Sequence, residues 1–353
     1  MIPRMIQHEV RRSVLSRESF YLRGAPSVGK TALVREVLGT LPHVYCSGWS
    51  AESRLLLYRF VEGRPHYGGM DRVVFDNSEW LELSIHQIHR HLREFPRVQF
   101  IYVGVGELTV QGSELPIKTH RLSQFSWVEL GGELERRLVW GMHPTGPREL
   151  RVPWKVRKEA RLAKLVRVLA MELGRELTLR GLGERVGVDK ATVGRYLGLL
   201  ESAGLVHSFP SVAKPGDAGQ YRRVFFQDNG IRNAALQDWR PWRGREDAEA
   251  LWVNFLVAER LKVRPDTKRC FDRNGVLFER HGEEWLGFGL NEAASHAHYR
   301  VSPENFEWFL RWEGHLFQNC QAASAWSRSM SAPLRIIAPR SDARRRNWLS
   351  GGL

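Results

Sequence analysis

The stretch Gly24-Ala25-Pro26-Ser27-Val28-Gly29-Lys30-Thr31 decides the fold of the first part of this chain. It matches in full the pattern G-x-x-x-x-G-K-[ST], in which a loop wraps its backbone N–H groups around phosphate oxygens. Residues 20–23 before it predict a short strand, and residues 32–38 after it predict the first turns of a helix. A glycine-rich loop that leads into a helix N-terminus forms an anion site, because the helix dipole adds positive charge there.

The loop predicts a nucleotide site with ATP and Mg²⁺ as its cofactors. Lys30 is expected to reach the β- and γ-phosphates, and Thr31 to be a ligand of Mg²⁺. The predicted nucleotide-binding residues are Gly24, Ala25, Pro26, Ser27, Val28, Gly29, Lys30, Thr31 and Ala32.

Downstream of the loop, apolar segments alternate with helix-like segments, as a parallel sheet with crossover helices requires. Strands are predicted at 43–46, 72–76, 99–104 and 125–130, with helices at 51–60 and 84–95. The first domain is therefore expected to be α/β, a P-loop parallel sheet with helices on both faces. Asp76 ends the 72–76 strand, where a carboxylate can hold Mg²⁺ opposite Thr31. Thr31 and Asp76 are the predicted metal residues.

The charge of the chain favours a polyanionic partner. Its 353 residues carry a formal net charge of +14, with a pI near 10.1. Residues 151–200 hold twelve Lys and Arg against five Asp and Glu, so half of the excess charge lies in one seventh of the chain. Nucleic acid is one explanation. The other is a solvated basic surface, or one that docks on an acidic neighbouring domain.

The composition also limits the location of the protein. No stretch of about 18 apolar residues is present, so neither a transmembrane helix nor a membrane partner is predicted. The first residues lack the apolar segment of a signal peptide. Cys46, Cys270 and Cys320 lie too far apart for the C-x-x-C spacing of metal sites. The expected location is the cytoplasm.

The basic region has the pattern of a winged helix. Helices are predicted at 161–173, 177–188 and 190–202, followed by strands that begin at 205 and 221 and flank a wing tip at 214–219. The residues expected to contact DNA are Lys190, Thr192 and Arg195 on the third helix and Arg222 and Arg223 on the returning strand. Winged helices also dock on proteins, so a protein partner stays open as the alternative.

Several of these motifs together resemble a prokaryotic AAA-type ATPase family that joins a P-loop domain to a winged helix and a restriction-endonuclease-like domain. The resemblance rests on the loop, Asp76, the helix and strand at 193–206, and the segment 225–231 with its aromatic–x–Asp–x–Gly pattern. It implies domains at 1–147, 148–235 and 236–353. The last is expected to be small and α/β, with strands at 276–280, 285–290 and 334–338 around a helix at 303–320.

The chain departs from that family at two sites of chemistry. Asn77 stands where hydrolysing members usually carry the glutamate that activates water, and amide groups cannot accept the proton. Glu79 can replace it only if the backbone swings its side chain inward. The C-terminal domain lacks an E-x-K pair, since Leu286 occupies the equivalent stretch, so it is expected to be catalytically inactive. Such ATPases carry a polar residue that senses the γ-phosphate directly after the strand equivalent to 99–104. In this chain that residue is either absent or moved to Thr109.

The sequence therefore predicts an ATP-binding, AAA-like protein that uses nucleotide state to position a winged helix on DNA. Its predicted catalytic residues are Lys30, Asp76 and Glu79, and only weak hydrolysis is expected. Two alternatives remain open at this point. One is a nucleotide-regulated subunit whose winged helix docks on a protein partner, and the other is an active ATPase that assembles into a ring as a homo-oligomer.

Overall fold

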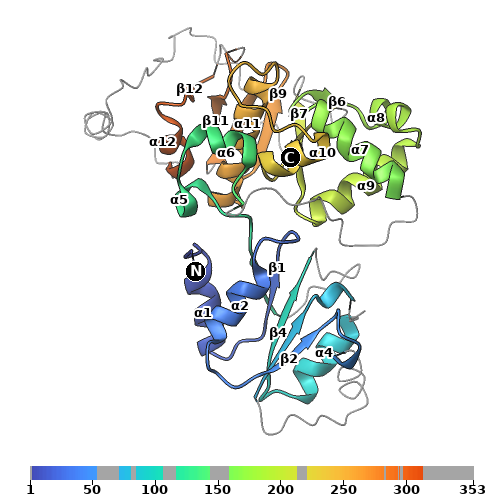
Figure 1. Cartoon of the computed structure of the whole chain (residues 1–353), viewed down its shortest axis with the longest axis vertical. Helices are drawn as coiled ribbons and strands as arrows, with labels where there is room; N and C mark the ends of the chain where they lie inside the picture. Colours follow the sequence, from blue (N-terminus) through green and yellow to red (C-terminus); the bar gives the residue numbers. More distant parts are fainter. Residues whose placement is uncertain are drawn as a thin grey trace. The chain divides into compact units, whose positions relative to one another are not determined.

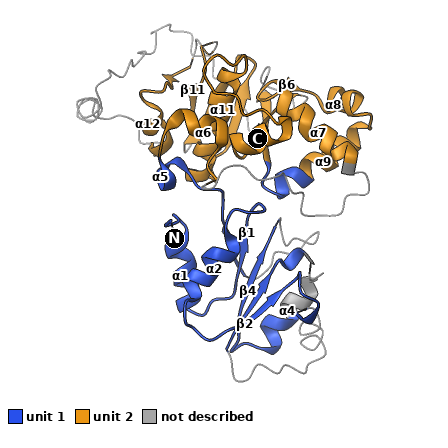
Figure 2. Ribbon diagram, viewed as in Figure 1, with its two compact units in different colours: residues 1–131, 151–155, 199–205 blue, residues 132–150, 156–198, 206–353 orange. Residues whose placement is uncertain are grey.

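The computed structural model describes residues 2–53, 71–80, 85–105, 117–143, 159–212, 221–281, 284–292, 294 and 297–312. Figure 1 shows their helices and strands in chain order. The chain divides into two compact units, coloured separately in Figure 2: residues 1–131, 151–155 and 199–205, and residues 132–150, 156–198 and 206–353. Within the described ranges, no helix combines the length and the apolarity that crossing a bilayer requires.

The first unit is built on a five-stranded sheet with the order β2-β3-β4-β1-β5, in which all neighbouring strands run parallel. The strands are β1 (Phe20–Arg23), β2 (Val44–Ser47), β3 (Arg72–Asp76), β4 (Gln99–Gly104) and β5 (Lys118–Arg121). This order confirms the predicted α/β class. Because the strands are parallel, the carboxyl ends of β1 and β3 lie at the same edge of the sheet, where open α/β sheets bind their ligands.

Helices cover both faces of this sheet, because successive side chains of a strand point to opposite faces. The helices are α1 (Gln7–Leu15), α2 (Lys30–Leu38) and α4 (Ile85–Glu94). Phe20 and Leu22 of β1 pack in one core with apolar residues of α1 and α2. Tyr21, between them in the sequence, packs in a second core with Phe75 and with Leu92 of α4.

The prediction of a strand at 125–130 is wrong, because Trp127–Leu130 form the short helix α5. A capping box starts this helix: the Ser126 hydroxyl accepts the Glu129 N–H, and the Glu129 carboxylate accepts the Ser126 N–H. The fifth strand is β5, in which His120 is buried and its three neighbours are exposed. An edge strand of this kind lacks the apolar pattern by which strands are predicted.

The second unit contains a seven-stranded sheet with the order β12-β11-β10-β9-β7-β8-β6. Its first elements are α6 (Leu134–Trp140), α7 (Glu159–Met171), β6 (Glu176–Leu177), α8 (Leu179–Val186), α9 (Lys190–Ser202, with residues 199–202 grouped in the first unit), β7 (Val206–Val212) and β8 (Tyr221–Phe226). β8 pairs antiparallel with both β7 and β6. The three predicted helices and the returning strand are therefore present, and the wing tip predicted at 214–219 lies outside the described residues.

The sheet continues into the C-terminal elements. These are α10 (Asn229–Leu236), α11 (Ala248–Val263), β9 (Arg269–Asp272), β10 (Val276–His281), β11 (Glu284–Gly289), β12 (Tyr299–Arg300) and α12 (Phe306–Arg311). β7 pairs in parallel with β9 through Ser211 and Phe271, so strands on the two sides of the domain boundary predicted at 235 share one sheet. The helix predicted at 303–320 ends at Arg311, because Trp312 has an extended backbone. The strand predicted at 334–338 lies outside the described residues.

Asp228 and Gly230, which carry the family resemblance, have structural roles. One Asp228 oxygen accepts the Gly230 N–H at 2.7 Å and caps α10, while the other accepts the Met142 N–H at 2.7 Å. A Cβ at Gly230 would lie 2.5 Å from the Trp140 carbonyl oxygen. The glycine is therefore required for the close approach of α10 to the end of α6.

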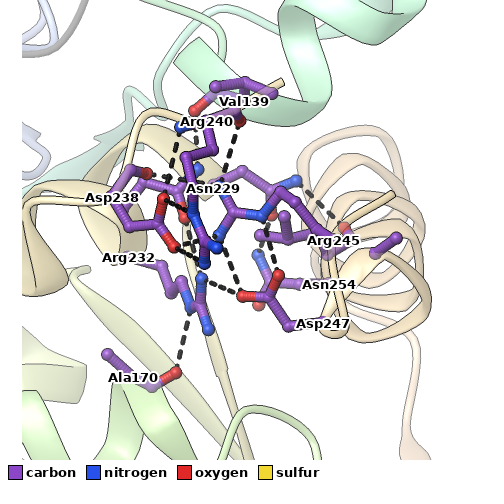
Figure 3. A network of polar contacts seen from close by, with 12 residues as sticks. Val139, Ala170, Asn229, Arg232, Asp238, Arg240, Arg245, Asp247 and Asn254 are labelled. Carbon is purple, nitrogen blue, oxygen red and sulfur yellow. Dashed lines mark hydrogen bonds and ion pairs between the residues drawn. The ribbon is translucent and has the colours of Figure 1, made fainter. Parts of the chain in front are cut away.

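Buried polar residues join the helices of this unit, as Figure 3 shows. Asn254 of α11 donates to the side chain of Asn229 of α10 at 2.7 Å. Arg232 donates to a carbonyl of α7 at 2.9 Å and pairs with Asp247, which also makes a bidentate pair with Arg245 at 2.7 and 2.9 Å. Satisfied networks of this kind stabilise one packing of the core.

Glu279 of β10 is a second buried charge, near the stretch where the resemblance implies a nuclease centre. Arg260 and Arg269 donate to its carboxylate at 2.8 and 2.7 Å, and all three side chains are buried. Burial alone would raise the pKa of Glu279, but the His281 imidazole, 3.4 Å away, and the charge of Arg260 hold it below its ordinary value. The absence of nuclease activity stays a prediction. It agrees with the pairing of Glu279 with Arg260 and Arg269, which leaves this carboxylate occupied.

Candidate nucleotide site at the phosphate loop

The loop between β1 and α2 owes its shape to backbone conformations that few residues adopt. Ser27 has a φ of 62° and Gly29 a φ of 95°, so the chain turns sharply before α2 begins at Lys30. Gly24 meets a different demand, since a Cβ there would lie 2.2 Å from the Leu122 carbonyl oxygen. The turn leads directly into the first N–H groups of α2, which have no partners within the helix.

Lys30 is buried at the centre of the loop. Its ammonium group donates to the carbonyl oxygens of Gly24 and Ala25, both at 2.8 Å. Burial lowers the pKa of Lys30 to about 8, and the negative charges of Glu79 and Asp76 oppose this shift. A lysine ammonium held in this way carries its charge at neutral pH and loses it under mildly alkaline conditions.

Asp76 lies at the carboxyl end of β3 and is nearly enclosed by donors. The Thr31 hydroxyl donates to Asp76 Oδ2 at 2.7 Å, and the Tyr45 hydroxyl donates to the same oxygen. The other oxygen, Oδ1, accepts the Asn77 N–H at 2.9 Å. The structure thus brings together the two residues predicted to hold Mg²⁺, and it adds Tyr45, which sequence reasoning missed.

Glu79 is directed toward the loop by the backbone of Asn77. Asn77 has a φ of 53°, in the left-handed region that asparagine tolerates better than most residues. The short 3₁₀ helix η1 (Ser78–Trp80) follows, and Glu79 Oε2 accepts the Val105 N–H at 3.2 Å. Burial raises the pKa of Glu79, while hydrogen bonds from the backbone and the charge of Lys30 act in the opposite direction.

Two polar side chains of η1 lie beside Gly104 at the end of β4, where the sequence itself lacks a polar residue. A Cβ at Gly104 would lie 2.4 Å from Ser78 Oγ and 2.9 Å from Glu79 Oε2. The Ser78 hydroxyl is buried and has no hydrogen-bond partner within the described part of the chain. Gly104 therefore leaves room for two polar side chains, and the alternative residue, Thr109, lies outside the described residues.

Arg4 contacts the phosphate loop through the backbone of Val28, and no sequence pattern predicted this contact. Its guanidinium donates to the Val28 carbonyl at 2.9 Å, to the Ser123 carbonyl at 2.6 Å and to Glu129 at 3.3 Å. It also lies 4.0 Å from the centre of the Phe125 ring. This buried arginine fixes the loop to the segment that follows β5. An isolated arginine before a helix gives no sequence signal for such a contact.

The donors at this site fit Mg²⁺. The Thr31 hydroxyl and the Asp76 carboxylate are hard oxygen ligands, and Mg²⁺ is usually held by one or two carboxylates together with phosphates. Within the described ranges, no group of three or more His, Cys, Asp or Glu side chains forms a site for a metal. When bound, the ion neutralises charge on the phosphate oxygens.

The five residues predicted to contact DNA differ in their availability. Lys190 and Arg195 are exposed on α9. The N–H and hydroxyl of Thr192 both donate to the Asp189 carboxylate at 2.8 Å, and these bonds cap the start of α9. Arg222 donates to Ser208 at 2.8 Å. Arg223 donates to backbone carbonyls of the same unit at 2.8 to 3.2 Å, so its guanidinium is committed to the fold.

The chain matches one protein family over part of its length and is similar to several solved structures. Residues 148–241 match the family described as "Domain of unknown function (DUF8612)". No curated protein matches the chain. The chain is 12% identical to the Walker-type ATPase of Pyrococcus abyssi, with a TM-score of 0.41, covering 67% of this chain and 96% of that one. For the RuvB Holliday junction branch migration motor of Thermotoga maritima, the identity is 15%, the TM-score 0.33 and the coverage 58% and 89%.

Proposed function

We propose that the chain binds ATP with Mg²⁺ at the phosphate loop, hydrolyses it weakly and uses the nucleotide state to position a winged helix on DNA. The observation that carries the first part is the hydrogen bond from Thr31 to Asp76, beside the buried ammonium of Lys30. A phosphate loop, a hydroxyl in the first turn of the helix after it and a carboxylate at the end of another strand are the groups that hold a triphosphate and its metal.

Each residue has a defined task in this proposal. Lys30 exchanges its two carbonyl acceptors for phosphate oxygens, which are stronger acceptors because they are charged. Thr31 and Asp76 hold the magnesium ion that accompanies the nucleotide. Glu79 accepts the proton of the attacking water, for which its raised pKa suits it. Asn77 contributes through its backbone, by turning Glu79 toward the loop.

Calorimetry of the whole chain with ATP and saturating Mg²⁺, together with a thermal melt of the same sample, tests the nucleotide site. We expect heat of binding and an upward shift of the melting temperature, because a ligand that binds only the folded state stabilises it. Absence of both signals would overturn the proposal. Phosphate release from the same sample measures hydrolysis separately.

The pKa of Lys30 leads to a prediction of proton uptake. At pH 9 most of this lysine is neutral, because its pKa of about 8 is below its ordinary value of 10.5. Bound phosphate favours the charged form, so nucleotide binding at pH 9 is expected to take up close to one proton, and at pH 7 almost none. Affinity should fall by roughly tenfold per pH unit above 8. Calorimetry in two buffers of different ionisation enthalpy measures the uptake, and Lys30→Met should abolish it.

The same shift predicts how stability depends on pH. Below pH 8 the folded chain bears the cost of a buried ammonium, and that cost disappears as pH rises from about 8 to 10.5, where the unfolded chain binds more protons. The contribution of Lys30 to stability therefore increases across this interval. Stability that does not rise between pH 8 and 10.5 in the wild type relative to Lys30→Met, measured by denaturant unfolding at each pH, would contradict this prediction. Equal nucleotide affinity at pH 7.5 and 9.5 with no proton uptake would contradict the preceding one.

The DNA-binding part of the proposal rests on α9 and its surroundings. The elements α7, β6, α8, α9, β7 and β8 follow one another in the order of a winged helix, with α9 in the place of the recognition helix. Lys190 and Arg195 are exposed there, and Arg161, Lys164 and Arg167 are exposed on α7. An exposed set of this kind suits the phosphate backbone of a duplex.

The double variant Lys190→Ala/Arg195→Ala is expected to weaken binding to duplex DNA by about tenfold and to make the salt dependence shallower by about two in log–log slope. The double variant Arg180→Ala/Arg185→Ala is the control. It removes two charges from α8, where Arg180 pairs with Glu184 at 3.0 Å and Arg185 with Glu172 at 2.7 Å. Fluorescence anisotropy at several salt concentrations measures both variants.

Equal losses in both double variants would mean that general charge, and not α9, attracts DNA. Unchanged DNA affinity in the first variant, with ATP binding intact, would favour the alternative in which α9 docks on a protein partner. In either case the nucleotide site would remain as proposed, because its test uses neither variant.

A further inference from the structure

We infer that Tyr45 is a positioning residue that competes with Mg²⁺ for Asp76 and so sets the magnesium concentration at which the nucleotide site becomes complete. This inference rests on the proposed nucleotide function and deepens it. The observation behind it is that the Tyr45 hydroxyl and the Thr31 hydroxyl donate to one and the same oxygen of Asp76.

The carboxylate of Asp76 has little capacity left beyond these bonds. Oδ1 accepts the Asn77 N–H at 2.9 Å, Oδ2 accepts two hydroxyl protons, and the side chain is buried. A magnesium ion, or a water bound to it, needs a lone pair of this carboxylate. The Tyr45 hydroxyl donates to the oxygen as such a water would, so the two exclude each other at Oδ2.

Tyr45 differs from Thr31 in what it can offer the ion. The threonine follows the loop lysine, and its hydroxyl oxygen can become a ligand of the ion while its O–H still donates a hydrogen bond to Asp76. Tyr45 comes from β2, beside β3 in the sheet, where it pairs in register with Val74. Its hydroxyl occupies Asp76 Oδ2 as a hydrogen-bond donor.

The ring of Tyr45 is held in place from α2. The Arg35 guanidinium lies 5.0 Å from the ring centre, in a cation–π contact, and Arg35 is exposed to solvent. The tyrosine is only partly buried, and its ring packs against the core that β1 shares with α1 and α2. Magnesium has to displace one hydrogen bond and this ring contact, and the cost appears as a higher magnesium requirement.

Tyr45→Phe tests the inference, because it removes the hydroxyl and keeps the ring. The measurement is the affinity for a fluorescent ATP analogue as a function of Mg²⁺ concentration, without any assay of hydrolysis. We expect the magnesium concentration at half effect to fall by about three- to tenfold, as loss of one hydrogen bond to a charged group allows. Affinity in the presence of a chelator should stay within about twofold of the wild type.

Tyr102→Phe is the matched control. Tyr102 is a buried tyrosine of β4 whose hydroxyl bonds to His91 at 3.2 Å, and it packs in the second core of the sheet, whereas Tyr45 packs against the first. Its variant should leave the magnesium dependence unchanged. If Tyr45→Phe does not fold, Arg35→Ala serves instead and should lower the requirement in the same direction, because it frees the ring.

An unchanged magnesium requirement in folded Tyr45→Phe, or a higher one, would overturn the inference, since the hydroxyl would then be neutral or helpful to the ion. If the wild-type chain fails to bind the nucleotide analogue at every magnesium concentration tested, the proposed function itself would be overturned. The two failures are therefore distinguishable in the same titration.

Discussion

Replacement of Lys30 by methionine is expected to weaken the binding of ATP with Mg²⁺ by at least about a hundredfold, the equivalent of about 3 kcal/mol. The reason is that Lys30 is the cation that the loop encloses, with its ammonium group 2.8 Å from two loop carbonyl oxygens. Phosphate oxygens lose this partner in the variant, and the enclosed position offers water little access to replace it. Calorimetry or a fluorescent nucleotide analogue measures the loss.

Methionine is chosen because it retains most of the length of the lysine side chain without its charge. The burial that lowers the pKa of Lys30 shows that the folded chain holds the ammonium at a cost, so the variant should melt within a few degrees of the wild type. Lys118→Met is the control, since Lys118 is an exposed lysine of β5 in the same sheet. Equal affinity for ATP in Lys30→Met and the wild type would remove the basis of the proposed function.

The sequence allowed the centre of this site to be predicted because its signals are local. The loop needs glycine, lysine and threonine at fixed spacing, and β3 is an uninterrupted buried strand that ends in Asp76. Both patterns can be recognised without knowledge of what packs against them. The parallel sheet then brings Thr31 to Asp76 across 45 positions of sequence.

The sequence did not reveal groups whose position depends on contacts between distant segments. Arg4 and Tyr45 each belong to segments without a motif, and only the folded chain brings them to Val28 and Asp76. The strand predicted at 125–130 failed for a related reason. Its many apolar residues are typical of a strand, but the capping box of Ser126 and Glu129 favours a helix. The edge strand of the sheet is instead the polar segment β5.

Asn77 illustrates a third kind of limit. From the sequence, an amide in place of the usual glutamate indicates a weakened ATPase. In the structure the same asparagine adopts a φ of 53° and the chain turns so that Glu79 bonds to the Val105 N–H. Residue type alone could not give this outcome, because it depends on Gly104 leaving space for the incoming carboxylate.

Glu79→Gln is therefore expected to lower the rate of ATP hydrolysis by about a hundredfold or more, the range in which general bases contribute. The amide oxygen of glutamine can still accept the Val105 N–H, so the affinity for ATP should change by no more than about threefold. Glu94→Gln, at the end of α4 and on the surface, is the control. Multiple-turnover phosphate release and nucleotide binding are measured on the same preparations.

The pH profile of kcat/KM distinguishes loss of a proton acceptor from a distorted site. In the wild type, activity should rise as Glu79 loses its proton, above the ordinary glutamate range because burial raises its pKa, and fall above about pH 8 as Lys30 becomes neutral. In Glu79→Gln the acid limb should disappear, while the alkaline limb remains and moves to lower pH, because the variant lacks the negative charge that opposes the lowering of the Lys30 pKa. A retained acid limb would assign it to another group. Phosphate release at background rate in the wild type would contradict hydrolysis and leave nucleotide binding to stand alone.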